Sequence, residues 1–89
     1  MIKPEYKYSE LTGKIIGCVM EVHNILGNEF QEVIYQRALS LEFNLQNITH
    51  EREYEMPIFY KENHIGTRRV DFLVEDKISV EIKALIKLE

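Results

Sequence analysis

The chain has 89 residues, which is enough for one domain with a modest core. Hydrophobic residues make up 45% of it, which argues against disorder, and no apolar run approaches the ~20 residues of a membrane-spanning helix. The net charge of −4 argues against broad, non-specific binding of nucleic acid, although a few local basic residues can still hold phosphates.

A first amphipathic helix is predicted between Ser9 and Leu26. Apolar residues recur there at spacings of three and four, a pattern typical of a helix with one buried face. This stripe consists of Leu11, Ile15, Cys18, Val19, Val22 and Leu26. Ser9 is the predicted N-cap and Gly27 the residue that ends the helix. Cys18 is the only cysteine, so we expect a core residue and a reducing, cytoplasmic setting.

A second helix is predicted from about Phe30 to Gln46, with Asn28 as its N-cap. Its predicted apolar stripe consists of Phe30, Ile34, Ala38, Leu41 and Leu45. Glu32 falls in the first turn, where the helix dipole favours a negative charge, and Tyr35 shares an adjoining face with it. We expect the Tyr35 ring to pack, with its hydroxyl hydrogen-bonded to a neighbour.

Three strands are predicted after the helices. Residues 53–60 form the first, and Pro57 places it at a sheet edge or a bulge because proline has no N–H to donate. A polar turn at 61–64 precedes a second strand that begins at Ile65. The expected fold is α/β with the order ααβββ, in which two helices pack on a small antiparallel sheet. The periodicity leaves open which face of the sheet the helices cover.

The last two strands form a hairpin whose register follows from its apolar pattern. A three-residue turn at 75–77 pairs Val74 with Ile78, Phe72 with Val80 and Val70 with Ile82, so all apolar residues share one face. The same register over a strand from 78 to 84 sets Asp71 opposite Glu81 and Arg69 opposite Lys83. Directly opposed carboxylates destabilise a sheet, so a counter-charge such as Lys83 or a divalent cation is required.

Asp71, Glu81 and Lys83 follow the pattern D-x9-E-x-K. Two carboxylates can bind Mg²⁺ or Mn²⁺, which can polarise a phosphodiester and lower the pKa of a bound water. Lys83 can align the attacking water or stabilise charge on the phosphate. Glu32 is the best candidate for a third carboxylate, and we favour this role over the alternative of an ordinary first-turn acid. Charged residues on a solvated strand are common, so this spacing alone is a weak signal.

The chain resembles the GxxExxY family, which is grouped with the PD-(D/E)XK nuclease-like superfamily. The matching segments are residues 22–27 (V-H-x-x-L-G), 32–42 (E-x-x-Y continuing into A-L and a glutamate), 70–74 (V-D-x-L-V) and 80–84 (V-E-x-K-A). The resemblance implies a restriction-endonuclease-like core with a site at Asp71, Glu81 and Lys83 and with Glu32 nearby. The chain departs from the family at Glu29, which stands where the family has the glycine of its name.

Relatives in the family typically continue into a further helix and strand. We therefore expect residues 1–89 to form a single nuclease-like domain, truncated by the loss of that C-terminal helix and strand. The predicted function is metal-dependent hydrolysis of nucleic acid, DNA rather than RNA, with Mg²⁺ or Mn²⁺ as cofactor, and a homodimer could form through an exposed sheet edge. The alternatives are a non-catalytic binding or oligomerisation module that keeps the fold, and a fragment that folds poorly alone.

Overall fold

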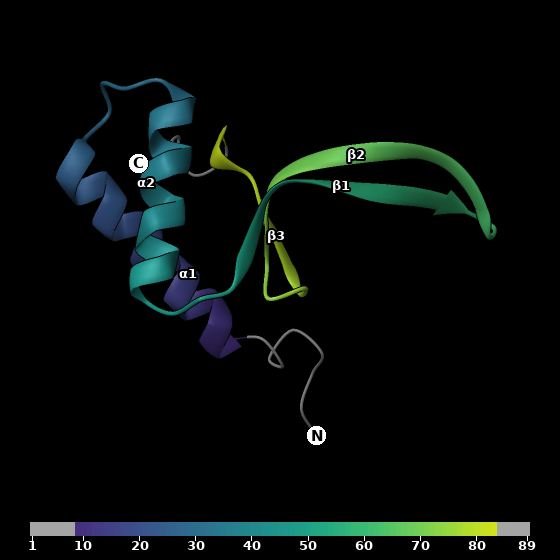
Figure 1. Cartoon of the computed structure of the whole chain (residues 1–89), viewed down its shortest axis with the longest axis horizontal. Coiled ribbons are helices and arrows are strands. Elements are labelled where there is room, and N and C mark those ends of the chain that lie inside the picture. The colour runs from purple at the N-terminus through teal and green to yellow at the C-terminus, as the bar shows by residue number, and fades with distance from the viewer. Residues whose placement is uncertain (1–8, 84–89) are drawn as a thin grey trace.

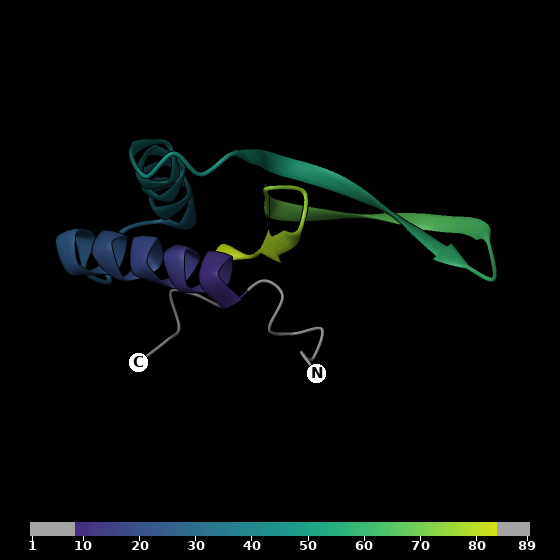
Figure 2. The same cartoon turned by 90° about the horizontal axis from the view of Figure 1, so that it is seen from below.

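A computed structural model describes residues 9–83 of the chain, and the order of its elements is ααβββ, as predicted (Figure 1). Two helices are followed by one antiparallel sheet with the strand order β1-β2-β3. The helices cross rather than run side by side, and together with β3 they form a body from which β1 and β2 extend (Figure 2). Within residues 9–83, no helix combines the length and apolar character needed to cross a lipid bilayer.

Helix α1 (Ser9–Leu26) confirms the first predicted helix. The predicted stripe faces the core: four of its residues are buried, and Leu11 and Leu26 pack against them. Gly27 ends the helix with a φ of 72°, a left-handed conformation that glycine adopts at little cost, and its N–H donates to the His23 carbonyl.

Helix α2 (Glu32–Leu45) begins later than predicted and buries a different face. Gln31 is the N-cap and makes no side-chain capping bond, so the prediction of Asn28 is wrong. The buried residues are Tyr35, Gln36, Leu39 and Phe43. Leu41 and Leu45 of the predicted stripe are 60% and 66% exposed. The helix carries two apolar stripes, and the one that contains Tyr35 packs on the sheet.

The long hairpin of β1 (His50–Tyr60) and β2 (Asn63–Val74) dominates the sheet. β1 is an edge strand, and the strand register shifts between Ile58 and Phe59, directly after Pro57. The prediction that proline marks an edge or a bulge is therefore confirmed. The two strands are longer than predicted and meet in a two-residue turn at Lys61 and Glu62 rather than in a turn over 61–64.

The second hairpin confirms the predicted turn and register but contradicts the predicted length of the last strand. β3 (Ile78–Val80) pairs Ile78 with Val74 and Val80 with Phe72 across a three-residue turn, in which the Lys77 N–H donates to the Val74 carbonyl. The strand ends at Val80, and 82–83 are helical. Asp71–Glu81, Arg69–Lys83 and Val70–Ile82 are therefore not strand pairs, and Ala84 lies outside the described residues.

The core lies between the helices and the apolar face of the sheet, which answers the question that periodicity left open. Phe43 of α2 meets Phe72 of β2 edge to face at 5.4 Å, and neither ring is exposed to solvent. The cluster also takes in α1 and, past the end of β3, Ile82. Glu51 and Glu53 of β1 are exposed to solvent. This packing holds Asp71 and Glu81 at the end of the body where β2 and β3 separate.

Candidate active site

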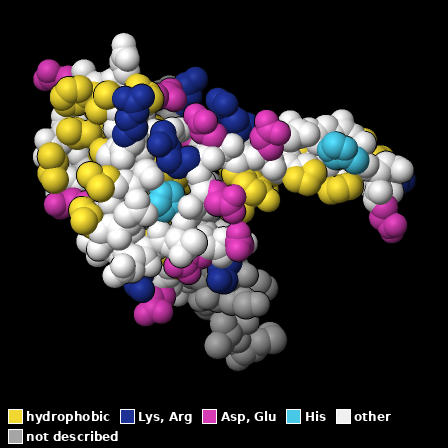
Figure 3. All heavy atoms as spheres, in the orientation of Figure 1, with side chains coloured by type: hydrophobic (Ala, Val, Ile, Leu, Met, Phe, Trp, Pro, Cys, Tyr) yellow, Lys and Arg dark blue, Asp and Glu magenta, His cyan; other side chains and the backbone are white. Residues whose placement is uncertain are grey.

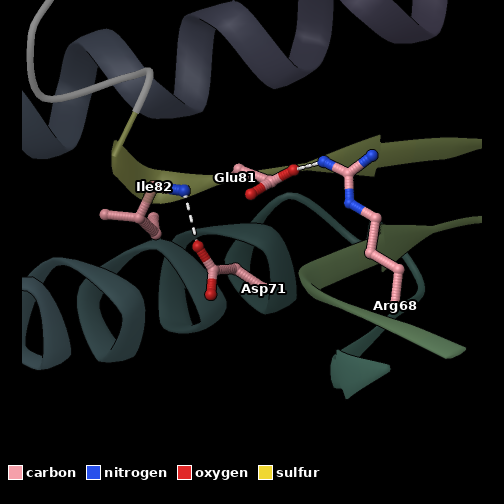
Figure 4. A network of polar contacts seen from close by, with 4 residues as sticks. All are labelled: Arg68, Asp71, Glu81 and Ile82. Atoms are coloured by element: carbon pink, nitrogen blue, oxygen red, sulfur yellow. Dashed lines mark hydrogen bonds and ion pairs between the residues drawn. The ribbon is translucent and has the colours of Figure 1, made fainter. Parts of the chain in front are cut away.

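Asp71 is a candidate acid that the fold holds by a backbone hydrogen bond. It lies on β2 between the core residues Val70 and Phe72, and its side chain is partly buried. Its Oδ2 accepts a hydrogen bond of 2.7 Å from the N–H of Ile82 (Figure 4). Because Ile82 is the middle residue of the E-x-K segment, this bond fastens Asp71 to the segment that carries the other two candidate residues. A bond from a neutral N–H to a carboxylate is of the stronger, charge-assisted kind.

Glu81 follows directly after β3 and is paired with an arginine. Its Oε2 accepts a hydrogen bond from Nη2 of Arg68. The Glu81 side chain is 41% exposed and the Arg68 side chain 60%. The structure thus pairs Arg68 with Glu81 and not with Asp71. In Figure 4 the two carboxylates turn to different partners, Asp71 to the Ile82 amide and Glu81 to Arg68.

Lys83 and Glu32 do not take the positions that the sequence predicted for them beside Asp71 and Glu81. Lys83 is exposed, two residues past Glu81, but it is not on a strand face because β3 has ended. Glu32 is in the first turn of α2, as predicted, and is exposed. Among residues 9–83, no group of three or more His, Cys, Asp or Glu residues is arranged to hold a metal ion. Glu32 therefore does not join Asp71 and Glu81 in one cluster in this structure.

Tyr35, three residues after Glu32, has a structural role that confirms the prediction from sequence. Its hydroxyl donates to the Gly27 carbonyl and accepts a bond of 3.3 Å from the Phe30 N–H. The ring is buried, and Phe30 stands edge-on to it at 6.4 Å. Tyr35 thus fixes the loop that joins α1 to α2, which sets the position of the turn that carries Glu32.

Two polar contacts that the sequence did not indicate tie α2 to β1. Arg52 donates to the buried Gln36 at 2.5 Å. Ser40 and His50 form the second contact, at 2.7 Å between Oγ and Nε2, while the His50 Nδ1 lies 3.0 Å from the Ile48 carbonyl. A carbonyl can only accept, so Nδ1 carries the proton and the Ser40 hydroxyl donates to Nε2 in the neutral ring. No local sequence pattern marks either pair, because their partners are 10 and 16 residues apart.

Cys18 is a core residue, as predicted, with 3% of its surface exposed. Burial raises the pKa of its thiol, and the nearby charge of Glu42 raises it further. A thiol that resists ionisation is a poor nucleophile. The candidate chemistry therefore rests on Asp71 and the E-x-K segment rather than on cysteine.

Comparison with known families places the chain in a superfamily but identifies no site residue. A family model described as the PD-(D/E)XK nuclease superfamily matches residues 9–89, which is nearly the whole chain. No curated protein and no solved structure matches the chain. The match includes both helices, the sheet and the D…E-x-K residues, while the smaller GxxExxY grouping is not distinguished by it.

Proposed function

This chain belongs to the PD-(D/E)XK nuclease superfamily, and we propose that it hydrolyses phosphodiester bonds in nucleic acid with the help of Mg²⁺ or Mn²⁺. The observation that carries the proposal is the hydrogen bond from Ile82 to Asp71. It joins the aspartate of the pattern to the E-x-K segment across 11 residues of sequence. In this proposal residues 1–89 act as one nuclease-like domain, and DNA is the preferred substrate over RNA.

The chemistry of the donors fits a divalent metal of this kind. Asp71 and Glu81 offer carboxylate oxygens, the ligands that Mg²⁺ prefers, and the exposure of Glu81 leaves it open to solvent and ions. A bound divalent cation would supply the Lewis acid that polarises the phosphodiester. Asp71 and Glu81 would hold the metal, and Lys83 would align the attacking water or offset the charge that builds on the phosphate. Glu32 stays a predicted third ligand of the metal.

Membership of the GxxExxY family within the superfamily is part of this proposal. Two of the resembling segments, 22–27 and 32–42, touch in the fold, because the Tyr35 hydroxyl donates to the Gly27 carbonyl. A contact between two segments gives a physical reason for both to be kept together. A cytoplasmic location and a homodimer through the exposed sheet edge also stay predictions, and light scattering on the purified chain measures the second of them.

The test compares Mg²⁺ binding and cleavage in the wild type and Asp71→Asn. Asparagine keeps an oxygen that can accept the Ile82 N–H, so the fold should survive while the negative charge is lost. We expect calorimetric Mg²⁺ binding and cleavage of duplex DNA by the wild type, and a loss of cleavage by at least about 100-fold in Asp71→Asn. Glu51→Gln is the matched control, since Glu51 is an exposed acid of the same sheet, and it should cleave as the wild type does.

Substitutions at the other acids separate their roles. Glu81→Gln should weaken both metal binding and cleavage, and Glu32→Gln should do so only if α2 contributes a ligand. Arg68→Ala removes the partner of Glu81 and should tighten Mg²⁺ binding. Equal cleavage by the wild type and Asp71→Asn, or no heat of Mg²⁺ binding, would show that the proposal is wrong. RNA in place of DNA tests the substrate preference in the same assay.

The alternative, a non-catalytic module that keeps the fold, is favoured by two observations. Glu81 is already paired with Arg68, and residues 9–83 contain no three-ligand cluster. A folded chain that binds DNA or itself but shows neither metal binding nor cleavage would support this alternative.

A further inference from the structure

The outer part of the β1–β2 hairpin, residues 56–69, extends away from the body of the protein and is called the arm below (Figures 1 and 2). The radius of gyration is 14.4 Å, whereas a compact domain of this length has about 12 Å. Residues 56–60 of β1 alone reach roughly 17 Å at about 3.3 Å per residue. The arm is a two-stranded ribbon, because β3 pairs only with residues 72–74 of β2.

The arm differs in charge from the rest of the chain. It contains Lys61, Arg68 and Arg69 and only one acid, Glu62, so its net charge is +2 in a chain of net charge −4. The four side chains are exposed. Lys61 stands at the tip, where its Nζ lies 5.6 Å from the centre of the Tyr60 ring. The basic residues therefore mark both the tip and the base of the arm, and the base adjoins the candidate site through the pair of Arg68 with Glu81.

Large apolar and aromatic side chains are exposed between these basic residues. The exposed fractions are 60% for Phe59, 60% for Tyr60 and 63% for Ile65, and none of the three belongs to the core. The ring centres of Phe59 and His64 lie 5.5 Å apart across the ribbon. In Figure 3 hydrophobic side chains follow the lower edge of the arm. Exposed apolar side chains beside basic ones suit apolar contact with base edges in a groove and ionic contact with phosphates.

We propose that the arm binds duplex nucleic acid by lying in a groove, with its basic residues on phosphates and its aromatic tip against the bases. The major groove, about 12 Å wide, admits a two-stranded β-ribbon. The positive charge of the arm complements the phosphates, which the remaining, acidic surface would repel. The choice of nucleic acid as the partner rests on the proposed function, and Arg68 at the base would bring the bound duplex to Asp71 and Glu81.

The test measures binding of a fluorescent duplex of about two helical turns by anisotropy, without divalent metal. Lys61→Glu should weaken binding roughly tenfold and reduce the salt dependence of the dissociation constant. Lys77→Glu is the matched control, because Lys77 is an exposed lysine in the turn between β2 and β3, away from the arm. It makes the same change in net charge and should leave the affinity within about twofold. Phe59→Ala removes an apolar contact with base edges and should weaken binding about threefold without a change in salt dependence.

Several results would overturn the inference. These are an equal loss of affinity in Lys61→Glu and Lys77→Glu, no binding by the wild type at low salt, and tighter binding to single strands than to the duplex. A fourth is a change in oligomeric state in Lys61→Glu with unchanged duplex affinity, which would make the arm an interface between chains. Circular dichroism establishes that each variant is folded.

The experiment separates this inference from the proposed catalysis. Asp71→Asn should bind the duplex at least as tightly as the wild type, since it removes a negative charge near the phosphates, while its cleavage is lost. If Asp71→Asn still cleaves but Lys61→Glu fails to bind, the catalytic residues are wrong and the arm is right. If Lys61→Glu binds normally while Asp71→Asn is inactive, the catalytic residues are right and the arm is wrong.

Discussion

The Tyr35 hydroxyl offers a direct test of whether the tyrosine of the E-x-x-Y segment is structural. Tyr35→Phe removes only the oxygen, which donates to the Gly27 carbonyl and accepts from the Phe30 N–H. Each such bond contributes about 1 kcal/mol, and the groups left behind in the half-buried loop are satisfied by water only in part. We expect the free energy of unfolding to fall by about 1–2 kcal/mol, which is roughly 5–15 °C in melting temperature for a chain of this size.

Thermal unfolding followed by circular dichroism measures this loss, and Tyr60→Phe is the control. The Tyr60 side chain is exposed at the tip of the hairpin, so removal of its hydroxyl should change the stability by less than about 0.5 kcal/mol. Equal stabilities of the two variants would refute the structural role of Tyr35. A loss of cleavage without a loss of stability in Tyr35→Phe would instead assign the hydroxyl to the chemistry.

Three further predictions concern the core, the thiol and the turn of the arm. Phe43→Ala should cost about 3–5 kcal/mol in urea unfolding because the ring is fully buried, while Phe59→Ala should cost less than about 0.5 kcal/mol. Because burial raises the pKa of the folded Cys18 thiol, the stability that Cys18 provides is complete at neutral pH and is lost as the pH rises through the folded pKa. The stability difference between wild type and Cys18→Ala should therefore shrink between neutral pH and about pH 10, and an unchanged difference would contradict this. Lys61→Asn combined with Glu62→Gly should raise the free energy of unfolding by about 1 kcal/mol, since φ is 47° and 68° at these positions.

The two helices show how far periodicity reaches. α1 has a single apolar stripe, so its buried face could be predicted residue by residue. α2 has one stripe through Leu41 and Leu45 and another through Leu39 and Phe43, and both satisfy helical spacing. Only the shape of the sheet decides between them, because Phe43 meets Phe72 edge to face. The sequence therefore predicts the helix but not its rotation.

The hairpin shows a similar limit at its far end. The alternation of apolar residues fixed the pairs Val74–Ile78 and Phe72–Val80, since a shift by one residue would expose the core face. The same alternation continues through Ile82, yet the strand ends at Val80. There the Asp71 carboxylate takes the Ile82 N–H at 2.7 Å. A side-chain acceptor that competes with the strand ladder leaves no mark on the period of the sequence.

The energies of the two contacts decide whether the candidate acids are available to a metal. The pair of Arg68 with Glu81 is exposed, so solvent screens it and it contributes about 0–1 kcal/mol. A divalent cation bound with a millimolar dissociation constant gains about 4 kcal/mol. The cation would therefore displace Arg68 from Glu81 at modest cost. Asp71 needs no such release, because Oδ2 can keep the Ile82 N–H while the other oxygen of the carboxylate binds an ion. The freed Arg68 lies at the base of the arm, where a phosphate of the bound duplex can replace Glu81 as its partner.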